Sequence, residues 1–449
     1  MGKYFGTDGV RGEAGRALSA ELAFHLGRAA AQVFRNERKS EGPVRILIGR
    51  DSRLSGQMFE AALSAGLTAC GAEVLLCGMI PTPGLSYLLQ HCQADAAAMI
   101  SASHNPYLDN GIKFFNRKGA KIADDLELKM ETYLDHPSAI EDASGAEIRH
   151  IQHLADASQR YEDFLASKAE APYQFPEIVI DCANGAASEI AQRLFPRLGL
   201  NCHFLACEPN GLNINSNCGS THMETLCRVV RERKAACGLA FDGDADRFLV
   251  CDEAGEVFDG DHLLCLFADH FFLQKNIEPK RIVVTVMSNL GFHKAMAERG
   301  IEVLATQVGD RYVHEAMLES DSLLGGEQSG HLIFRSHQNT GDGLLSALML
   351  LNCLKERGVP LSELNALMSS YPQYLLNVPC SKKSDPKLWS YLESAISEAE
   401  ASLDGKGRIL VRASGTEELV RVMTEAEDAS LAQRLAEEMA AKIEAYTAD

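Results

Sequence analysis

The sequence has no excess of basic residues. Its 43 lysines and arginines are outnumbered by 62 aspartates and glutamates, which gives a formal net charge of −19 at pH 7. Nucleic acids and anionic membrane surfaces attract basic proteins, so this charge balance argues against both as partners. An anionic small molecule is still compatible with it, provided that arginines and lysines gather locally in one cleft.

The chain also lacks the marks of a membrane-spanning or secreted protein. No apolar run is long enough to cross a bilayer, and residues 1–6 contain no apolar signal core, so we expect a cytoplasmic protein. The 13 cysteines are odd in number, scattered and without a C-x-x-C motif. Several, such as Cys70, Cys77 and Cys265, lie in apolar stretches, which is typical of buried cysteines in a reducing cytosol.

Two motifs of widespread enzyme classes are missing. The G-x-x-x-x-G-K-[ST] spacing does not occur, which excludes a Walker A phosphate loop. No G-x-S-x-G elbow occurs either, which argues against a serine hydrolase. Any phosphate or serine chemistry must therefore depend on other segments.

The composition and patterning that are present predict an α/β protein of several domains. A chain of 449 residues is long for one hydrophobic core, and 46% apolar with 23% charged residues is typical of globular proteins. Strand-like runs at residues 45–48, 73–76, 178–180 and 282–286 alternate with helical segments. This alternation predicts parallel-rich sheets covered by helices.

Helical patterns and polar breaks complete the coarse organisation. Residues 20–34 carry apolar side chains on one face, and residues 344–354 are apolar nearly all round, which predicts a buried helix. Ser430 and Gln433 have the spacing of a capping box and predict the start of a final helix. Candidate domain boundaries fall in three polar stretches: residues 140–150, 252–255 and 369–372.

The most informative segment is Ser101–Pro106. It follows the short apolar run 96–100, which has the character of a buried strand, and it ends in a turn signal, Asn105-Pro106. Open α/β sheets bind ligands at the carboxyl ends of their strands, so a serine here is placed to face a ligand. Alone the signal is weak, because most such loop residues only bond to their own backbone.

A second segment, residues 242–247, alternates Asp242, Asp244 and Asp246 with small residues between two strand-like runs. Such crowding of carboxylates favours a divalent cation bound through oxygen ligands. An acidic surface turn and an EF-hand loop are the alternatives, and Glu253 even stands at position 12 of such a loop. However, position 6 is Arg247, where an EF-hand needs glycine, and the flanking helices are missing.

Two further loops carry binding chemistry. Residues 325–331 place a glutamate, a serine and a histidine among three glycines, which suits sugar contacts and acid/base work; a hairpin loop with a surface histidine is the alternative. Residues 412–417, followed by Arg421, combine two guanidiniums with two hydroxyls between strand-like runs. That inventory is typical of a bound phosphate dianion, and a basic turn is the alternative.

Together with five other segments, these loops resemble the α-D-phosphohexomutase family over nearly the whole chain. The other matching segments are residues 4–12, 49–56, 109–114, 181–186 and 306–311. The resemblance implies three similar α/β domains and a smaller C-terminal α+β domain around a central cleft. Combined with the polar breaks, it places these domains at residues 1–150, 151–253, 254–369 and 370–449.

The resemblance also implies a role for individual residues. The expected catalytic residues are Ser103 as the phosphoserine, Lys113 and His331 as acid/base groups, and Arg247. The expected substrate contacts are Arg11, Glu327, Ser329, Arg412, Ser414, Gly415, Thr416 and Arg421. Mg²⁺ would be held by Ser103, Asp242, Asp244 and Asp246. Acid/base work would need a lowered pKa at Lys113, which nearby cations could supply.

A separate stretch, residues 209–222, resembles the branch of this family that acts on glucosamine phosphates. The implied reaction interconverts glucosamine 6-phosphate and glucosamine 1-phosphate through a sugar 1,6-bisphosphate, and it supplies precursors of UDP-N-acetylglucosamine and the cell wall. The partner is then a small sugar phosphate, with an activating kinase or autophosphorylation and a homodimer left open. Mannose or glucose phosphate mutases of the same family, and a metal-dependent sugar phosphatase, are the alternatives.

Overall fold

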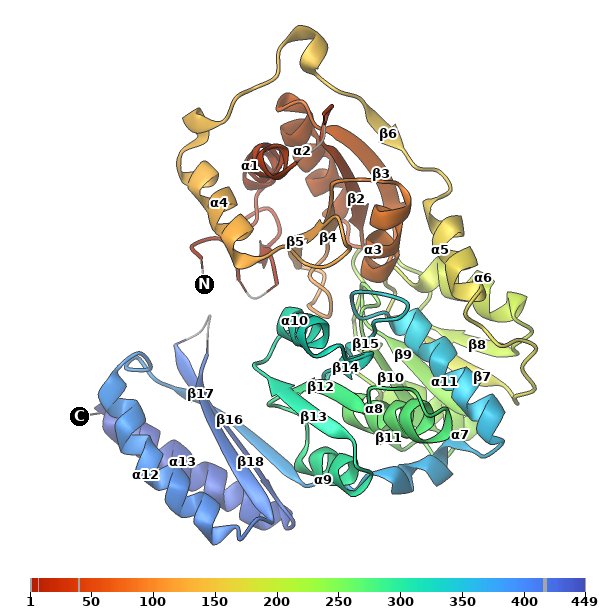
Figure 1. Ribbon diagram of the computed structural model, residues 1–449, viewed down its shortest axis with the longest axis vertical. Coiled ribbons are helices and arrows are strands. Elements are labelled where there is room, and N and C mark those ends of the chain that lie inside the picture. Colours follow the sequence, from red (N-terminus) through yellow and green to blue (C-terminus); the bar gives the residue numbers. More distant parts are fainter. Residues whose placement is uncertain (1, 7, 39–40, 415–417, 449) are drawn as a thin grey trace. The chain divides into compact units, whose positions relative to one another are not determined.

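The computed structural model describes residues 2–6, 8–38, 41–414 and 418–448, and it divides into two compact units (Figure 1). The first unit comprises Met1–Val286 and Ile301–Asn365, and the second comprises Met287–Gly300 and Ala366–Asp449. Three sheets belong to the first unit and one to the second. Within the described ranges, no helix is both long and apolar enough to cross a membrane.

The first sheet has six strands and contains the Ser101–Pro106 loop at its carboxyl edge. In spatial order the strands are β1 (Val10–Glu13), β5 (Asp109–Asn116), β4 (Ala96–Ile100), β2 (Arg45–Arg50), β3 (Glu73–Met79) and β6 (Ile151–His153). Strands β4, β2, β3 and β6 are parallel, whereas β5 runs antiparallel to β4 and β1. The predicted strands at residues 45–48, 73–76 and 96–100 are confirmed.

Helices cover both faces of this sheet, which explains why its central strands are apolar throughout. The helices are α1 (Ala20–Glu37), α2 (Gly56–Ala69) and α4 (Asp124–Asp135) on one face and α3 (Thr82–His91) on the other. Helix α1 begins where the Ser19 hydroxyl accepts the N–H of Leu22 at 3.1 Å. Helices α1 and α2 approach closely, because a Cβ on Gly66 would lie 2.0 Å from the Phe24 carbonyl oxygen.

The second and third sheets each end in an antiparallel hairpin that carries one of the predicted loops. The second has the order β11 (Val257–Phe258), β10 (Phe248–Asp252), β9 (Cys237–Phe241), β7 (Ile178–Asp181) and β8 (Cys202–Leu205). The third has the order β13 (Glu302–Thr306), β12 (Arg281–Thr285), β14 (Leu324–Gly326) and β15 (Leu332–Phe334). Because residues 242–247 join the antiparallel strands β9 and β10, the EF-hand alternative is wrong.

The remaining helices of the first unit pack around these sheets (Figure 1). They are α5 (Ala157–Ala166), α6 (Ser188–Arg197), α7 (Glu224–Arg233), α8 (Gly260–Ala268), α10 (Asp310–Ser320) and α11 (Gly343–Arg357), with short turns η1 (Pro137–Ala139), η2 (Gly145–Glu147), η3 (Asp269–Gln274) and η4 (Leu361–Leu367). Residues Leu344–Leu354 of α11 are buried without exception, so the predicted buried helix is confirmed.

The second unit is an antiparallel sheet covered by helices, an α+β arrangement. Its strands have the order β16 (Gln373–Pro379), β18 (Leu419–Ala426) and β17 (Gly407–Ala413), and its helices are α9 (Leu290–Glu298), α12 (Pro386–Ser402) and α13 (Ala429–Ala448). The predicted capping box is wrong, because α13 already begins at Ala429. There the Asp428 carboxylate accepts the Ser430 N–H at 2.7 Å, and Gln433 donates to Glu437 instead.

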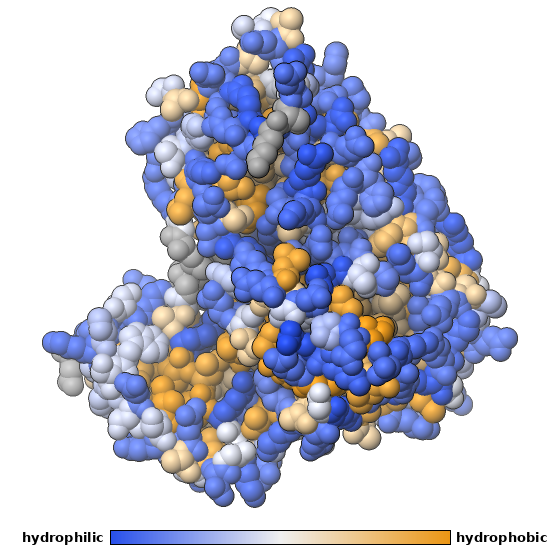
Figure 2. All heavy atoms as spheres, viewed as in Figure 1, coloured by the Kyte–Doolittle hydropathy of each residue, from blue (hydrophilic) through white to orange (hydrophobic). Residues whose placement is uncertain are grey.

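The surface and the interior separate as the composition predicts. On the face shown in Figure 2, hydrophilic residues predominate and apolar residues form smaller groups. Cys70, Cys77 and Cys265 are buried among apolar side chains, as the sequence predicts.

Candidate active site

Ser103 lies just after β4, with its side chain directed at the aspartate loop. Its Oγ donates a hydrogen bond to Asp242 Oδ2 at 2.6 Å, and its backbone N–H donates to Ser101 Oγ at 2.9 Å. The residue is 2% exposed and has a φ of 51°, in the left-handed region that serine rarely adopts. The structure thus brings together two segments that lie 139 residues apart in the sequence.

Asp242, Asp244 and Asp246 form a buried cluster in which one carboxylate oxygen of each lies within 4.8 Å of the others. Asp244 Oδ1 and Asp246 Oδ1 are buried, and no described residue donates a hydrogen bond to either. Buried acceptors without donors are costly, whereas hard divalent cations take such oxygens as ligands. The three carboxylates therefore fit a divalent cation.

Burial and neighbouring charges shift the pKa values of Asp242 and Asp246 in opposite directions. Burial and the neighbouring Asp246 and Asp244 raise the pKa of Asp242 to about 8. Burial also acts on Asp246, but Lys113, His331 and Arg247 outweigh it and hold its pKa below the usual range. A bound cation would relieve the repulsion that raises the pKa of Asp242.

Lys113, on β5, lies within the carboxylate cluster. Its Nζ is 2.8 Å from Asp244 Oδ2, 3.6 Å from Asp246 Oδ2 and 3.8 Å from Asp8 Oδ2. Burial alone would lower the Lys113 pKa, but these carboxylates raise it above its usual value. The predicted lowering of this pKa is therefore wrong for this arrangement, because the nearest groups are anions and not cations.

His331 follows the tip of the β14–β15 hairpin and is 3% exposed, so it is not the surface histidine of the alternative interpretation. Its Nε2 accepts the Gly341 N–H at 2.9 Å, and its Nδ1 lies 3.7 Å from Asp246. Burial lowers the His331 pKa, but Asp246 and Asp310 outweigh it and raise that pKa. The Gly341 hydrogen bond opposes a second proton on Nε2, so this geometry favours a proton on Nδ1.

Three charged residues to which the sequence assigned no role complete a ring with Lys113, His331 and Asp246. They are Asp8, Lys121 and Asp310. Lys121 bridges Asp8 and Asp310, with its Nζ 2.7 Å from Asp310 Oδ2, and His331 Nε2 lies 3.7 Å from Asp310. Carboxylates alternate with the two lysines and His331 around this ring, which fixes both predicted acid/base residues against the metal loop.

Glu327 and Ser329 lie in the hairpin loop that leads to His331. Burial raises the pKa of Glu327, and its Oε1 accepts the Gly309 N–H at 3.2 Å. The Ser329 hydroxyl is buried, and no described residue is its hydrogen-bond partner. Both side chains thus offer polar atoms that a sugar hydroxyl could bind.

Positive charge gathers beside Ser103. Burial, and after it the charges of Arg247 and Arg11, lower the pKa of His104 to about 4. The Arg247 backbone N–H donates at 3.2 Å to Asp242, the carboxylate that also accepts from Ser103. Arg11 is paired with Asp8, and its buried Nε has no partner among the described residues. Two arginines near a serine hydroxyl favour a phosphate group at that position.

In the second unit, Arg412 and Arg421 are directly opposite each other on β17 and β18. Burial and the charge of Arg421 lower the pKa of Arg412. Like charges directly opposite on one sheet face destabilise it, and an anion between them removes that cost. Ser414 is buried, and its carbonyl accepts the Lys383 ammonium at 2.8 Å; Gly415 and Thr416 lie outside the described residues.

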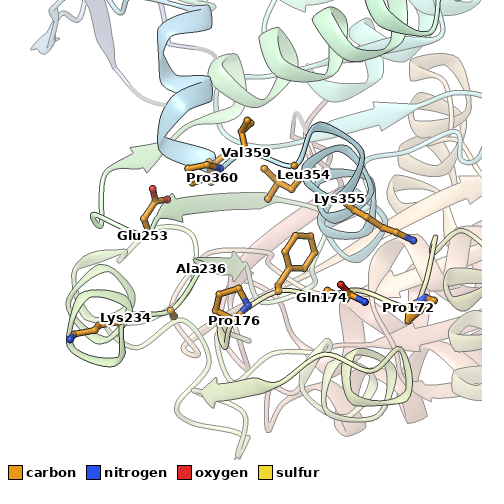
Figure 3. A pocket seen from close by; sticks show the side chains of 14 residues that line it. Pro172, Gln174, Pro176, Lys234, Ala236, Glu253, Leu354, Lys355, Val359 and Pro360 are labelled. Carbon is orange, nitrogen blue, oxygen red and sulfur yellow. The ribbon is translucent and has the colours of Figure 1, made fainter.

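A cavity of ≈ 790 Å³ lies elsewhere in the first unit, and Figure 3 shows its lining. Residues 172–176 before β7 and residues 354–361 at and after the end of α11 form most of its wall, which is largely apolar. Lys234, Glu253 and Lys355 also line it. None of the residues that line it belongs to the aspartate cluster or the ring around it. The candidate active site is therefore separate from this cavity.

Curated relatives share close to half of their residues with this chain over nearly its full length. A phosphoglucosamine mutase of Shouchella clausii is 47% identical over 439 residues, which cover 98% of each chain. A phosphoglucosamine mutase of Bacillus subtilis is 48% identical over 432 residues, which cover 96% of each chain.

Solved structures share the fold. A phosphoglucomutase/phosphomannomutase family protein from Burkholderia thailandensis is 25% identical with a TM-score of 0.82, covering 99% of this chain and 98% of that one. Aspergillus fumigatus N-acetylphosphoglucosamine mutase, solved with GlcNAc-6P and magnesium, is 20% identical with a TM-score of 0.72, covering 99% and 96%.

Family models for the four phosphoglucomutase/phosphomannomutase domains match in order along the chain. The α/β/α domains I, II and III match residues 2–140, 150–255 and 259–371, and the C-terminal domain matches residues 375–442. With the full-length relatives, these matches show that the chain belongs to the phosphoglucomutase/phosphomannomutase family, the α-D-phosphohexomutases.

Proposed function

We propose that this protein is an isomerase that interconverts glucosamine 6-phosphate and glucosamine 1-phosphate. The observation that carries the substrate is the similarity to phosphoglucosamine mutases at 46–48% identity along nearly the whole chain. The hydrogen bond from Ser103 to the aspartate cluster supports the reaction type, a phosphoryl transfer through the enzyme. The four domains at residues 1–150, 151–253, 254–369 and 370–449 are part of the same proposal.

Ser103 carries the phosphoryl group in the resting enzyme. The 1-hydroxyl oxygen of glucosamine 6-phosphate attacks this phosphorus, the bond from phosphorus to Ser103 Oγ breaks, and the hydroxyl proton passes to a basic group. The 1,6-bisphosphate then reorients, and Ser103 Oγ gives up its proton to a basic group and attacks the phosphorus of the 6-phosphate. The bond from that phosphorus to the 6-oxygen breaks, and the 6-oxygen takes up a proton. Glucosamine 1-phosphate leaves, and the phosphoserine is restored, so no net phosphate is consumed.

Asp242, Asp244, Asp246 and the Ser103 oxygen would hold Mg²⁺, since the unsatisfied buried oxygens of Asp244 and Asp246 suit a hard cation. When bound, the ion neutralises charge that develops on the transferring phosphoryl group. Arg247 lies within electrostatic reach of Asp242 and Glu327, and it would stabilise the same charge from the protein side. The first phosphoryl group could come from a sugar 1,6-bisphosphate or from a kinase.

The remaining residues bind and orient the sugar phosphate. Lys113, which its carboxylate neighbours keep protonated, would donate a proton to a reacting oxygen, and His331 would accept or return one. Both are positioned by the ring that contains Asp8, Lys121 and Asp310. Glu327 and Ser329 would hold sugar hydroxyls in either orientation of the bisphosphate. Arg11 would contact a phosphate near Ser103, and the loop of the second unit (Arg412, Ser414, Gly415, Thr416, Arg421) would bind a phosphate of the substrate.

Ser103→Ala tests the phosphoryl carrier. We expect turnover to fall by at least about a thousandfold, because the covalent route is lost, while the unfolding temperature stays near that of the unmodified protein. Intact mass should show one phosphoryl group on the unmodified protein, removable by phosphatase, and none on the variant. Ser216→Ala, at an exposed serine, is the matched control.

Two results would contradict this proposal. Activity of Ser103→Ala within a few fold of the unmodified protein would exclude Ser103 as the carrier. Release of inorganic phosphate in place of an isomerised sugar phosphate would identify the phosphatase alternative.

A further inference from the structure

A fully buried arginine lies beneath the Ser103 loop. Arg53 is 1% exposed, and its guanidinium comes from the turn between β2 and α2. Its three nitrogens donate to one carboxylate and four carbonyls: Asp51 Oδ2 (2.8 Å) and the backbone oxygens of Ser103 (2.9 Å), Asn105 (2.9 Å), Asp109 (3.0 Å) and Pro106. A guanidinium has five N–H donors in a fixed fork, so every one of them is used here.

Asn215, which follows the Ser101–Pro106 loop in the sequence whereas Arg53 precedes it, donates to two of the same carbonyl oxygens. Its Nδ2 lies 2.8 Å from the Ser103 oxygen and 3.0 Å from the Asn105 oxygen. Asn215 is 7% exposed and has a φ of 57°, a conformation that asparagine adopts more readily than most residues. One nitrogen of Arg53 and one of Asn215 thus each bridge the same pair of carbonyls.

The backbone N–H of Ser103 is held by the same hydrogen-bond network. The Ser103 N–H donates to Ser101 Oγ, and that hydroxyl donates at 2.7 Å to Asp51 Oδ2, which also accepts from Arg53 Nε. Ser103 has a left-handed φ of 51°, which a serine keeps only where its surroundings over-determine it. With both backbone groups held, the position of the Ser103 Cβ is fixed, and from there the hydroxyl donates to Asp242 Oδ2 at 2.6 Å.

The metal loop packs directly onto this arrangement. A Cβ on Gly243 would lie 2.6 Å from the Ser103 oxygen and 2.8 Å from Asn215 Nδ2, so no larger residue fits between them. Since Gly243 stands between Asp242 and Asp244, the contact sets how far the serine hydroxyl is from the aspartates. The held carbonyl of Ser103 therefore helps to set the distance between the Ser103 hydroxyl and the aspartate cluster.

We propose that Arg53 and Asn215 are positioning residues that clamp the carbonyls of Ser103 and Asn105 and so aim the Ser103 hydroxyl at the metal loop. This inference rests on the proposed mutase function. It gives Asn215, in the segment 209–222, a role through the Ser101–Pro106 loop that needs no contact with the sugar. Neither residue touches the reacting atoms, so their effect is on geometry alone.

Asn215→Gly is the sharpest test, because glycine keeps a φ of 57° without strain while the side chain that carries the donor is removed. The control is Asn217→Gly in the same segment, where φ is 52° and the side chain is exposed. Arg53→Lys is a second variant that keeps the charge but cannot bridge the same set of carbonyls. For each we would measure kcat and KM for glucosamine 6-phosphate, the unfolding temperature, and hydrogen exchange of the peptide that contains Ser101–Pro106.

We expect Asn215→Gly to lower kcat by about 10- to 100-fold, with KM within about threefold and faster exchange confined to that peptide. Arg53→Lys should behave alike, and Asn217→Gly should match the unmodified protein. A role in stability alone would lower the unfolding temperature and leave kcat unchanged below it.

Unchanged kcat in Asn215→Gly, or an equal loss in Asn217→Gly, would overturn the clamp. If the unmodified protein turned over no glucosamine phosphate, the proposed function would fail instead. The hydrogen exchange would then still decide the clamp, since an unchanged rate in the Ser101–Pro106 peptide refutes it without any substrate.

Discussion

The two carboxylate oxygens of Asp244 have different tasks. Oδ2 accepts hydrogen bonds from Thr82 Oγ1 at 2.6 Å and Lys113 Nζ at 2.8 Å. The buried Oδ1 has no hydrogen-bond partner among the described residues. One oxygen therefore ties the metal loop to α3 and β5, and the other is oriented as a ligand.

Asp244→Asn should weaken Mg²⁺-dependent turnover. The amide removes one negative charge and one good ligand atom. Changes to residues that only support metal ligands already lower activity by roughly tenfold, so we expect a loss of turnover at least that large. The measurement is turnover of glucosamine 6-phosphate against Mg²⁺ concentration after chelator treatment. Both the maximal rate and the apparent Mg²⁺ affinity should fall.

Asp252→Asn is the matched control. Asp252 is buried on β10 of the same sheet, and one of its oxygens accepts the N–H groups of Ala254 and Glu256 at 2.9 Å, a task that asparagine can keep. Its Mg²⁺ dependence should equal that of the unmodified protein. Full turnover by chelator-treated unmodified protein would remove the metal from the mechanism.

At this scale the sequence predicted the residues whose chemistry is unusual in itself. Three alternating aspartates favour a cation because their charges repel one another, and Ser103 stands at a strand exit. Asp8 and Asp310 lie in two of the segments that resemble the family, but their role depends on Lys121, which is 113 and 189 positions away, so those segments alone did not reveal it. The predicted lowering of the Lys113 pKa was wrong for the same reason, because the charges that surround Lys113 come from distant parts of the sequence.

The N-terminus of α11 depends on a buried carboxylate. Asp342 Oδ1 accepts the Leu345 N–H at 2.9 Å and the Tyr161 hydroxyl at 2.8 Å, which joins α11 to α5. Burial raises the Asp342 pKa to about 6, although these hydrogen bonds and that of Gln338 lower it in part. The charged form is therefore less favourable in the folded protein than in the unfolded chain.

Asp342→Asn should change how stability depends on pH. The folded state holds this proton up to about pH 6 and the unfolded state only to about pH 4, so the unmodified protein loses stability as pH rises between these values. The loss is complete above pH 6 and amounts to up to roughly 3 kcal/mol. Relative to the unmodified protein, the variant should gain by that amount between pH 4 and pH 7 in urea unfolding.

Asp385→Asn is the control for this prediction. Asp385 also caps a helix, α12, and also accepts a tyrosine hydroxyl, from Tyr446 at 2.9 Å. Hydrogen bonds from the Lys387 N–H and Tyr446 lower its pKa, so its difference from the unmodified protein should stay flat between pH 4.5 and pH 7. A flat difference for Asp342→Asn as well would show that Asp342 is charged throughout this range.

The opposed arginines of β17 and β18 should act on substrate binding. Loss of a guanidinium–phosphate contact costs about 1.5–3 kcal/mol, so Arg412→Ala and Arg421→Ala should each raise KM by about 10- to 150-fold. Some loss of kcat is expected too, because binding energy away from the reacting atoms also orients the substrate. Lys406→Ala, just before the opposite end of β17, is the control, and unchanged kinetics in both arginine variants would show that this pair binds no substrate phosphate.

Element prediction succeeded where one pattern dominated and failed where two competed. The strand at residues 96–100 and the buried helix at 344–354 have unbroken apolar runs, and both are confirmed. At α13, Asp428 and Ser430 both have side chains that can cap a helix, and the packing of Leu435, Met439 and Ile443 does not choose between them. The cap then depends on one residue of backbone register, which periodicity does not determine.

As a whole, the molecule is strongly acidic, yet its substrate is expected to be an anion. The described site resolves this conflict locally, since Arg11, Lys113, Lys121 and Arg247 lie around the aspartates. Composition could predict that such a concentration must exist, but only the fold shows which residues form it.

Glucosamine 6-phosphate should be preferred over glucose 6-phosphate and mannose 6-phosphate, by at least about tenfold in kcat/KM. Its 2-amino group is largely protonated near neutral pH, so it suits a site rich in carboxylates, whereas a hydroxyl in that position gains little from them. Competition among the three hexose phosphates, on one preparation of phosphorylated enzyme, measures this preference directly. Equal or higher kcat/KM for mannose 6-phosphate would overturn the assignment to amino sugars and leave phosphoryl transfer through Ser103 standing, because that step depends on Ser103 and the aspartates and not on the 2-substituent.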